Sequence, residues 1–488
     1  MATDDWTGML GAWAQGAGPM YRLLAEALQK AVLEGSIVAG TRLPAERTLA
    51  RLLAISRTTV AGAYEMLHEE EWVERRVGSG TWVKPIVGAR SWQRRDTFAA
   101  TLKRNPLYDS LLGSNQPFID FSKASGGDPA VVPYSTYALP EYEIAELLEQ
   151  PGYVPLGLPA LRRAIAARYS RRGLATGEEQ ILVTNGAQQA ISLVAALYVQ
   201  RGDTVLVENP TFVGAIDTLG AGGGRLVPVP IEGMRIRVDL LPGLARAHYP
   251  QLLYVSPTCQ NPTGTIFTVT ERREIVRFAA EHGIPVLEDN TLADLVITGE
   301  EPRPIAAYAE DGPVLSVGSM SKLFWAGLRI GWVRAPQPLI ARLARLKLMA
   351  DLGTGLISQA IAVRLLESTD VVRARRREEL ALALTRTSSA LREHLPEWEW
   401  TAPSGGTFLW VRLPNTDAQE FAQMALRCGL VVTPGIAMSV DGSHTSYLRL
   451  PFFLNSGLFD EGFSRLIDAW AAFTRLAATE RHMVNVVV

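Results

Sequence analysis

Short apolar runs alternate with helical patterns between residues 181 and 335, and this alternation limits the fold more than any other feature. The runs with the length and composition of buried strands are 181–184, 204–208, 226–229, 252–256, 286–288, 314–317 and 330–334. Strands separated by helices predict a mostly parallel sheet covered by helices. In such an α/β sheet, ligands bind at the carboxyl ends of the strands.

The stretch SVGSMSKLFWAGLRIGW, residues 316–332, carries the candidate nucleophile. In it Lys322 stands beside small hydroxyl residues and shortly before an arginine. A lysine that forms an imine needs an uncharged amine, whereas a phosphate needs hydroxyl donors and a guanidinium close by. After residue 124 the only other lysine is Lys347, which lies in a helical run and which we expect to have no phosphate-binding neighbours.

Two other interpretations of Lys322 compete with an imine role. By composition alone, it is a surface lysine in a Ser/Gly loop. Ser319 to Lys322 also fits the Ser-x-x-Lys signature of penicillin-recognising enzymes, but that family requires a Lys-Thr-Gly strand as well. No lysine in this chain is followed by Thr-Gly or Ser-Gly, so we reject the second interpretation. The neighbouring motifs favour the imine.

These motifs follow the predicted strands. The TNGAQQ segment opens a helix, so the backbone N–H groups of Ala187 and Gln188 can hold a phosphate. Phe212 follows the second run, where a ring can stack on a planar heterocycle. Asn261 offers an amide to a phenolic oxygen, and Asp289 ends a buried strand, where a carboxylate can pair with a protonated ring nitrogen.

Residues 1–84 predict a separate, small helical domain. Apolar residues recur with helical spacing from Met20, and a second helix has Pro44 near its start. Ser56 is expected to cap a third helix, and two short β-rich runs then flank a hairpin. Three helices followed by a basic hairpin make a winged helix-turn-helix, although a helical dimerisation module has a similar pattern.

DNA requires cations and short donors on the element that enters the major groove, with phosphate donors on either side. The residues that supply these groups are Arg42, Arg47, Arg57, Thr58, Thr59, Arg75 and Arg76. Residues 19–84 carry nine Lys and Arg against eight Asp and Glu, so the domain is nearly neutral overall. The acids expected to lie beyond the contact surface are Glu65, Glu69, Glu70, Glu71 and Glu74.

Over residues 19–83 the sequence resembles the DNA-binding domain of the GntR family of bacterial transcription regulators. The most specific parts are GTRLPAER, the helix start SRTTV and the wing GSGT. The resemblance implies DNA contacts by Arg47, Arg57 and the wing residue Gly78, with Ser56 at the start of the reading helix.

From about residue 121 to about residue 477 the motifs closely resemble fold-type I aminotransferases, which bind pyridoxal 5′-phosphate (PLP). The resemblance includes the segments YVPLG and SGGTF. It implies that Lys322 holds the PLP aldehyde, Asp289 the pyridine nitrogen and Asn261 the ring O3′, while Phe212 stacks on the ring. The residues that it assigns to the phosphate are Ala187, Gln188, Ser319 and Arg329.

Two further positions concern the substrate and the chemistry. Arg449 matches the arginine with which the family grips a substrate carboxylate, a task that suits a bidentate guanidinium. Thr291 stands where the family usually has a tyrosine that contacts O3′. Because threonine is shorter and less acidic, we expect PLP binding to survive and efficient transamination to be impaired.

The order of the two motif sets resembles the MocR subfamily of GntR regulators. The expected parts are a winged helix-turn-helix (1–84), a basic linker (85–120) and an aminotransferase-like domain (121–488) whose small C-terminal subdomain starts near residue 370. The resemblance implies a homodimer in which the large domains pair head to tail. It also implies an internal aldimine of PLP with Lys322, and an amino compound, or PLP itself, that shifts the DNA-binding domains.

Two other functions fit the same motifs. One is a working PLP-dependent aminotransferase with an accessory DNA-binding domain, and the other is a PLP sensor that controls vitamin B6 genes.

The acidic N-terminus lacks the features of a signal peptide, and the longest apolar stretch, AISLVAALYV, is too short for a membrane span. Cys259 and Cys428 show no metal-ligand spacing, so we expect a cytoplasmic protein without a structural metal. The net charge of −2 excludes neither nucleic acid nor a small molecule as the partner.

Overall fold

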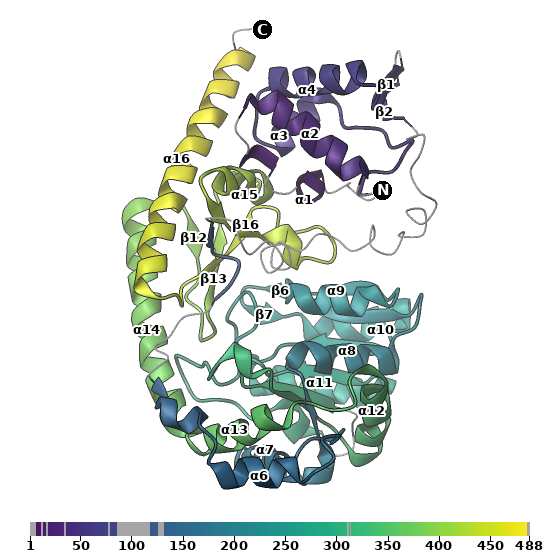
Figure 1. The fold of residues 1–488 in the computed structure, drawn as a ribbon, viewed down its shortest axis with the longest axis vertical. Coiled ribbons are helices and arrows are strands. Elements are labelled where there is room, and N and C mark those ends of the chain that lie inside the picture. The colour runs from purple at the N-terminus through teal and green to yellow at the C-terminus, as the bar shows by residue number, and fades with distance from the viewer. Residues whose placement is uncertain are drawn as a thin grey trace.

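A computed structural model gives the architecture of the chain (Figure 1). A small helical domain lies at one end of the molecule, a layered α/β domain lies at the other, and a smaller subdomain lies between them. The described residues are 6–10, 13–15, 18–33, 36–76, 79–84, 118–124, 131–309, 312 and 314–485. Most of the expected linker, residues 85–117, falls outside them.

The N-terminal domain is a winged helix-turn-helix with its own apolar core. Its elements are α1 (Trp6–Leu10), η1 (Trp13–Gln15), α2 (Met20–Leu33), α3 (Glu46–Leu52), α4 (Arg57–Glu69), β1 (Val73–Arg76) and β2 (Gly80–Val83). Ser56 caps α4 as predicted, because its side chain accepts a hydrogen bond from the Thr59 N–H. Pro44 lies just before α3 and outside its first turn, since Ala45 is the N-cap.

An eight-stranded sheet forms the centre of the α/β domain, in the order β4-β11-β10-β9-β8-β5-β6-β7. Its strands are β4 (Ile181–Thr184), β5 (Thr204–Asn209), β6 (Arg225–Glu232), β7 (Arg235–Ile236), β8 (Leu252–Val255), β9 (Val286–Asp289), β10 (Val314–Ser319) and β11 (Gly331–Arg334). Every run predicted as a strand is one. The sheet is mostly parallel, but β11 is antiparallel to both of its neighbours, and β7 is antiparallel to β6.

Helices cover both faces of this sheet (Figure 1). They are α6 (Glu141–Leu148), α7 (Pro159–Arg171), α8 (Ala187–Tyr198), α9 (Val213–Ala221), α10 (Leu241–His248), α11 (Val269–His282), α12 (Gln337–Ala350) and α13 (Leu356–Glu367), with short 3-10 turns η5 (Tyr134–Tyr137), η6 (Glu178–Gln180), η7 (Val238–Leu240), η8 (Ile305–Tyr308) and η9 (Ala326–Leu328). Successive strand residues enter different cores, since Leu182 and Val183 belong to separate apolar clusters. The sheet is therefore buried on both sides, as its continuous apolar runs predict.

The C-terminal subdomain packs a second, four-stranded sheet in the order β12-β13-β16-β15 against helices. Its elements are α14 (Thr369–His394), β12 (Glu399–Trp400), β13 (Phe408–Arg412), α15 (Ala418–Arg427), β14 (Leu430–Val431), β15 (Thr433–Pro434), η10 (Gly435–Met438), β16 (Tyr447–Pro451) and α16 (Ser456–Asn485). The short strand β3 (Ile119–Asp120) pairs in parallel with β14, so the chain enters the large domain through this subdomain.

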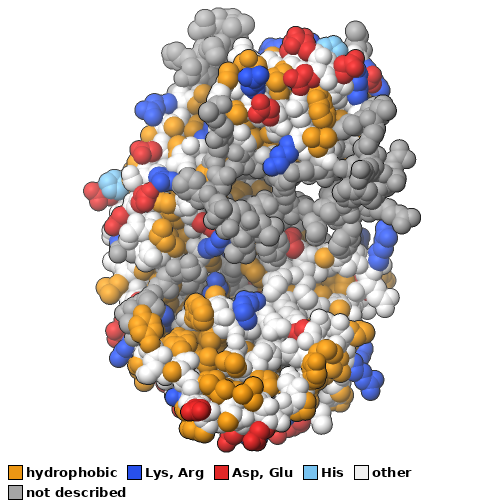
Figure 2. All heavy atoms as spheres, viewed as in Figure 1, with side chains coloured by type: hydrophobic (Ala, Val, Ile, Leu, Met, Phe, Trp, Pro, Cys, Tyr) orange, Lys and Arg blue, Asp and Glu red, His pale blue; other side chains and the backbone are white. Residues whose placement is uncertain are grey.

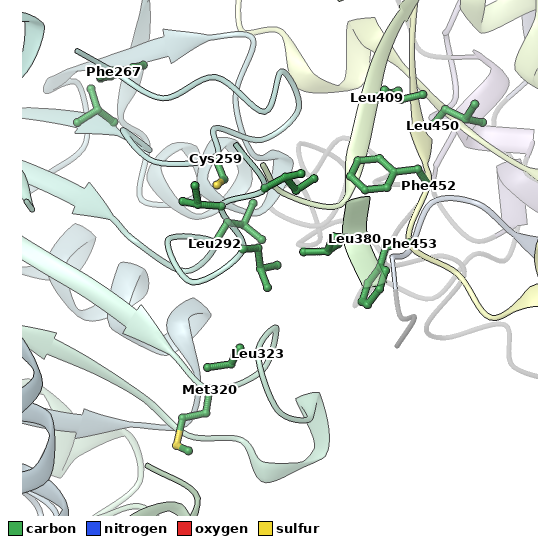
Figure 3. Packing of buried hydrophobic residues seen from close by; sticks show 14 of the residues in the cluster. Cys259, Phe267, Leu292, Met320, Leu323, Leu380, Leu409, Leu450, Phe452 and Phe453 are labelled. Atoms are coloured by element: carbon green, nitrogen blue, oxygen red, sulfur yellow. The ribbon is translucent and has the colours of Figure 1, made fainter. Parts of the chain in front are cut away.

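One apolar core joins the subdomain to the α/β domain (Figure 3). Leu292 and Leu323 come from loops of the α/β domain, whereas Leu409 and Phe452 come from the subdomain. The winged helix-turn-helix also touches the subdomain, because α3 lies against α15 and Arg51 pairs with Glu420 at 3.4 Å (Figure 1). Among the described residues, no helix combines the length and the apolar character needed to cross a membrane.

Candidate cofactor site and DNA-binding face

The register of three neighbouring strands assembles the predicted phosphate site. Ser319 at the end of β10 pairs with Gly331 on β11, which in turn pairs with Thr184 at the end of β4. Immediately beyond Thr184 the chain turns into α8, whose first residue is Ala187. The sheet thus brings the hydroxyl of Ser319 next to the free N–H groups at the start of a helix, which attract an anion.

Two glycines leave room for this turn. Gly186 has a φ of +79°, and a Cβ atom there would lie 2.8 Å from Nη2 of Arg329. A Cβ atom on Gly331 would lie 2.5 Å from the carbonyl carbon of Gly186. Arg329 itself has a φ of +53° and donates from Nη2 to the Asn185 carbonyl at 3.0 Å. The guanidinium is therefore held over the helix start, next to the predicted phosphate ligands.

Ser321, which the sequence did not assign to the site, completes the hydroxyl cluster. The Ser319 hydroxyl donates to the Ser321 hydroxyl at 3.0 Å, and the Ser321 N–H donates back to Ser319 at 3.1 Å. Lys322 follows directly, so the candidate nucleophile and the phosphate donors lie on one turn of chain.

The Lys322 amine is prepared for nucleophilic chemistry. Burial, reinforced by the nearby Arg449 guanidinium, lowers the pKa of Lys322 to about 8. Burial also lowers the pKa of Arg449 to about 10. A lysine with a pKa near neutrality carries a usable fraction of free amine, which is what imine formation requires.

Asp289 ends β9 and is held by two donors. Its Oδ1 accepts from the Thr291 N–H at 2.9 Å, and its Oδ2 accepts from the Tyr254 hydroxyl at 2.8 Å. Tyr254 is fully buried on β8, and the pKa of its hydroxyl is raised well above its usual value by burial and by the Asp289 carboxylate. Sequence analysis missed this tyrosine because a Tyr in an apolar strand looks like a core residue. Within the described structure, the buried Thr291 hydroxyl has no hydrogen-bond partner.

Arg449 connects the two parts of the large domain. It lies on β16 of the subdomain, yet its Nη1 donates to Oδ1 of Asn261 at 3.3 Å. Its Nη2 donates to the Ser122 carbonyl at 2.6 Å, and its guanidinium lies 4.1 Å from the Phe408 ring centre. Because Asn261 accepts through Oδ1, its amide nitrogen remains available to a phenolic oxygen. The Nε of Arg449 is buried, and no described group bonds to it.

A buried carboxylate positions the loops that carry Phe212 and Asn261. Glu208 accepts from the Thr211 hydroxyl, the Ser256 N–H and the Gln260 amide at 2.9 to 3.0 Å. Burial raises the pKa of Glu208 to about 8 in spite of these donors. The three donors favour the ionised form and so oppose the effect of burial. The predicted stacking residue Phe212 is half-buried and packs against Gly214, next to the side chain of Gln188.

The predicted DNA contacts lie on the winged helix-turn-helix as expected from their order, but most of the arginines are paired. Arg57 at the start of α4 donates to Glu46 at 3.0 Å. Thr58 and Thr59 share hydrogen bonds with the Ser56 hydroxyl. Arg47 and Arg42 are exposed and make no ion pair with any described residue, whereas Gly78 lies outside the described residues.

Glu65 and Glu74, which we expected to lie beyond the contact surface, reach two of the predicted contact arginines. Arg75 pairs with Glu65 at 2.7 Å, and Arg76 pairs with Glu74. Both arginines belong to strand β1, and that strand runs next to the end of α4, so acids from the helix and from the strand itself reach them. The wing is therefore less basic than its sequence suggests.

Comparison with known proteins agrees with this architecture. Residues 143–466 match the family described as aminotransferase class I and II, and residues 20–83 match the bacterial regulatory proteins of the gntR family. MocR of Rhizobium meliloti, described as a probable rhizopine catabolism regulatory protein, is 30% identical over 396 residues, which cover 78% of each chain. The chain belongs to the MocR-type regulators of the GntR family. Another relative, the HTH-type transcriptional regulator YisV of Bacillus subtilis, is 28% identical over 89% of this MocR-type chain and 92% of its own length.

A solved aminotransferase shows the same fold as the large domain. LysN, the α-aminoadipate aminotransferase of Thermus thermophilus, is 26% identical with a TM-score of 0.71, and it covers 79% of this chain and 100% of its own. That structure contains N-(5′-phosphopyridoxyl)-L-leucine. PLP is accordingly the cofactor of this MocR-type protein, as the sequence predicted.

The residues of the site fit PLP. Lys322 offers an amine of lowered pKa, Asp289 an oriented carboxylate, and Asn261 a free amide nitrogen. The glycine turn before α8, with Arg329 above it, leaves space and donors for the phosphate. When bound, PLP supplies an aldehyde and an electron sink, while the chain supplies the nucleophile and the orienting groups.

The lowered pKa of Lys322 leads to a pH prediction. Only the neutral amine reacts with PLP, so the rate of attachment should rise as the pH passes through about 8 and level off above it. Arg449→Met removes a positive charge that helps to lower the pKa of Lys322, so the midpoint should move to higher pH. Arg449→Lys keeps the charge and should keep the midpoint. Stopped-flow absorbance across a pH series measures these rates, and an unmoved midpoint in Arg449→Met would contradict the assignment.

Proposed function

We propose that this chain is a transcription regulator that binds operator DNA through its winged helix-turn-helix and senses an amino compound at PLP held by Lys322. The observation that carries the proposal is the lysine of lowered pKa beside a phosphate-binding turn, in a chain that also has a GntR-type domain. Because its target is DNA, we expect it to work in the cytoplasm.

The charges of the site support an effector with a carboxylate. Burial and the positive charge of Arg449 lower the pKa of Lys322, so the two cations repel each other across the site. The pKa of Arg449 itself is lowered by burial, against the opposing charge of Asp120. A bound carboxylate beside Arg449 would offset this repulsion, and the unpaired Nε of Arg449 provides a donor for it. The ligand we propose therefore carries both an amine, which competes with Lys322, and a carboxylate.

A continuous path leads from Arg449 to the DNA-binding domain. Arg449 on β16 pairs with Thr433 on β15, and β15 packs against α15. At the start of α15, Glu420 pairs with Arg51 of α3. A ligand that draws β16 toward Asn261 would also move α15 and, with it, the winged helix-turn-helix. Such a shift requires that the ligand binds one arrangement more tightly than the other.

An exposed apolar face supports the proposed homodimer. It is formed by η5, α6 and the start of α13, which are neighbours, together with the loop at Tyr153. Its exposed side chains are Tyr134, Tyr142, Leu148, Tyr153, Leu352 and Ile357. Hydrophobic side chains are visible over this end of the molecule in Figure 2, where α6 and α13 lie in Figure 1. Contiguous apolar surface of this kind marks an association site, and a second copy in head-to-tail arrangement is the partner we propose.

A working aminotransferase with an accessory DNA-binding domain is the alternative. Thr291 argues against it, because it stands where the aminotransferase resemblance implies a tyrosine, and its buried hydroxyl has no described partner. Turnover of an amino acid with 2-oxoglutarate would favour it. A response of DNA affinity to PLP alone would favour a cofactor sensor.

Arg47 should contact DNA directly, because it is exposed on α3 and no described acid pairs with it. Arg47→Ala is expected to weaken operator binding about tenfold. It should also reduce the slope of log affinity against log salt concentration by about one, because one phosphate contact is lost. Arg345→Ala, which removes an exposed arginine from α12, serves as the control and should leave affinity unchanged. Fluorescence anisotropy at several salt concentrations measures the affinity of both variants and its salt dependence.

The proposed dimer predicts that the wild-type complex contains two chains per operator. A single chain per operator would contradict the dimer.

The central test of the proposed function is ligand-dependent DNA binding. Titration with PLP and then with amino acids, in the presence of labelled upstream DNA, should produce a cofactor absorbance band and a change in DNA affinity of about fivefold or more. Lys322→Ala should lose both while it still binds DNA without ligand. A normal effector response in Lys322→Ala would refute the proposal.

The Arg51–Glu420 pair should contribute to coupling and little to DNA affinity itself. It is largely solvent-exposed on the Arg51 side, and exposed pairs contribute at most about 1 kcal/mol. Glu420→Arg should therefore reduce the ligand-induced change in DNA affinity by roughly two- to fivefold. The double variant Arg51→Glu/Glu420→Arg should restore it. If both variants respond like the wild type, the signal does not pass through this contact.

A further inference from the structure

Lys347 is fully buried in α12, although sequence analysis placed it in an ordinary helical run without phosphate-binding neighbours. Its ammonium donates to Oδ1 and Oδ2 of Asp351 at 2.6 and 2.7 Å. Burial lowers the pKa of Lys347, while the Asp351 carboxylate opposes the shift. Burial of a charged pair costs desolvation free energy, so a buried lysine paired with a carboxylate indicates a specific structural or functional role.

Asp351 also forms hydrogen bonds with the turn that precedes α8 and with the first turn of that helix. Its Oδ2 accepts from the side-chain amide of Asn185 at 2.6 Å and from that of Gln189 at 2.6 Å. Gln189 also accepts the Asn185 N–H at 2.7 Å through its own oxygen. Two side chains, Asp351 at the C-terminal end of α12 and Gln189 on α8, therefore fix Asn185, and the carbonyl of Asn185 accepts a hydrogen bond from Arg329. Lys347 lies in a helix as predicted and bonds to none of the predicted phosphate ligands, but Asp351 connects it to the turn that carries them.

We propose that Lys347 and Asp351 are positioning residues for the PLP phosphate, and that they act through Asn185 and Gln189 on the turn from Thr184 to Ala187. The inference rests on the proposed PLP site at Lys322. The N–H groups of Ala187 and Gln188 can bind a phosphate only if the turn points them at it, and Gly186, with its positive φ, is a flexible residue in that turn. The Thr184 hydroxyl holds the turn from within by donating to the Gly186 carbonyl at 3.0 Å, and the carboxylate of Asp351 holds it from outside the site.

The nearby surface gives this network a second role within the same proposal. Met349 and Leu352 flank Asp351 and are exposed, and Gly353 packs on the backbone of Val154, next to the exposed Tyr153. The Gly353 N–H donates to Oδ1 of Asp351 at 3.0 Å. Asp351 thus links the phosphate turn to the apolar face assigned to the second copy, so cofactor binding and pairing of subunits should support each other.

The test compares PLP with pyridoxal, which has the same aldehyde and ring but no phosphate. Dissociation constants for both are measured from the absorbance of the lysine-bound form with the full-length protein. Asp351→Asn should raise the dissociation constant for PLP about tenfold and that for pyridoxal less than about twofold, since a lost hydrogen bond to a charged group has roughly this effect. A residue with a merely structural role would weaken both ligands equally.

Asp351→Asn leaves the Lys347 ammonium buried without its carboxylate, and this could destabilise the fold. A second variant that keeps the ion pair therefore tests the positioning role separately. Gln189→Met removes one link to the turn but keeps the Lys347–Asp351 pair, and it should raise the PLP constant about threefold with pyridoxal unchanged. Arg345→Ala on the exposed face of α12 should change neither constant.

The outcomes separate this inference from the proposed function. If the wild type binds PLP but Gln189→Met keeps the same preference for PLP over pyridoxal, the proposed positioning role is refuted. The proposed function as a PLP-binding regulator is then unaffected. Equal weakening of both ligands in Asp351→Asn and Gln189→Met also overturns it. A wild-type chain that shows no cofactor band would overturn the PLP site itself, and with it both proposals.

Discussion

The cofactor site depends on the register of three strands. Ser319, Gly331 and Thr184 form one row across β10, β11 and β4, and the chain leaves this row toward Lys322 on one side and toward α8 on the other. A shift of one residue in any of these pairings would turn side chains to the opposite face of the sheet. Gly331 fixes the spacing, because only a residue without Cβ allows the β4–α8 turn to approach β11. Lysine, hydroxyls and helix start therefore form a site only when the sheet is correctly paired.

Around this row, buried polar groups orient the residues that would touch PLP. Tyr254 and the Thr291 N–H hold Asp289, Glu208 holds the loops of Phe212 and Asn261, and Asp351 holds Asn185. Tyr254 and Glu208 are buried and Asp351 is half-buried, and each makes the hydrogen bonds named here, which makes the geometry costly to distort. Unlike the residues above, which belong to the α/β domain, Arg449 comes from the subdomain, and it bonds to Asn261 of the α/β domain. A ligand at Arg449 therefore acts on both parts of the large domain at once.

The winged helix-turn-helix presents a different electrostatic problem. Arg57, Arg75 and Arg76, which the sequence predicts as DNA contacts, are each paired with a glutamate of the same domain, so a phosphate at any of these arginines would compete with that acid. Exposed pairs exchange partners at small cost, and the competition lowers affinity without abolishing it. In any regulator whose DNA affinity changes with a ligand, moderate affinity lets a modest coupling energy change operator occupancy.

The sequence by itself determined every element whose cause is local. The apolar runs from residue 181 to residue 334 became strands, Ser56 became the cap of α4, and the motifs around Lys322, Asp289 and Asn261 pointed to PLP. The motif order also identified the two domains, because each motif set is short and continuous in the chain.

Only the tertiary structure decided how distant residues meet. The contacts of Tyr254 with Asp289, of Glu65 with Arg75 and of Lys347, through Asp351, with Asn185 join segments that no local pattern relates. The position of β11, antiparallel between β4 and β10, was equally absent from the alternation of strands and helices. Local propensity and periodicity are properties of neighbouring residues, whereas strand order and buried pairing result from the packing of the whole chain and become visible only in the fold.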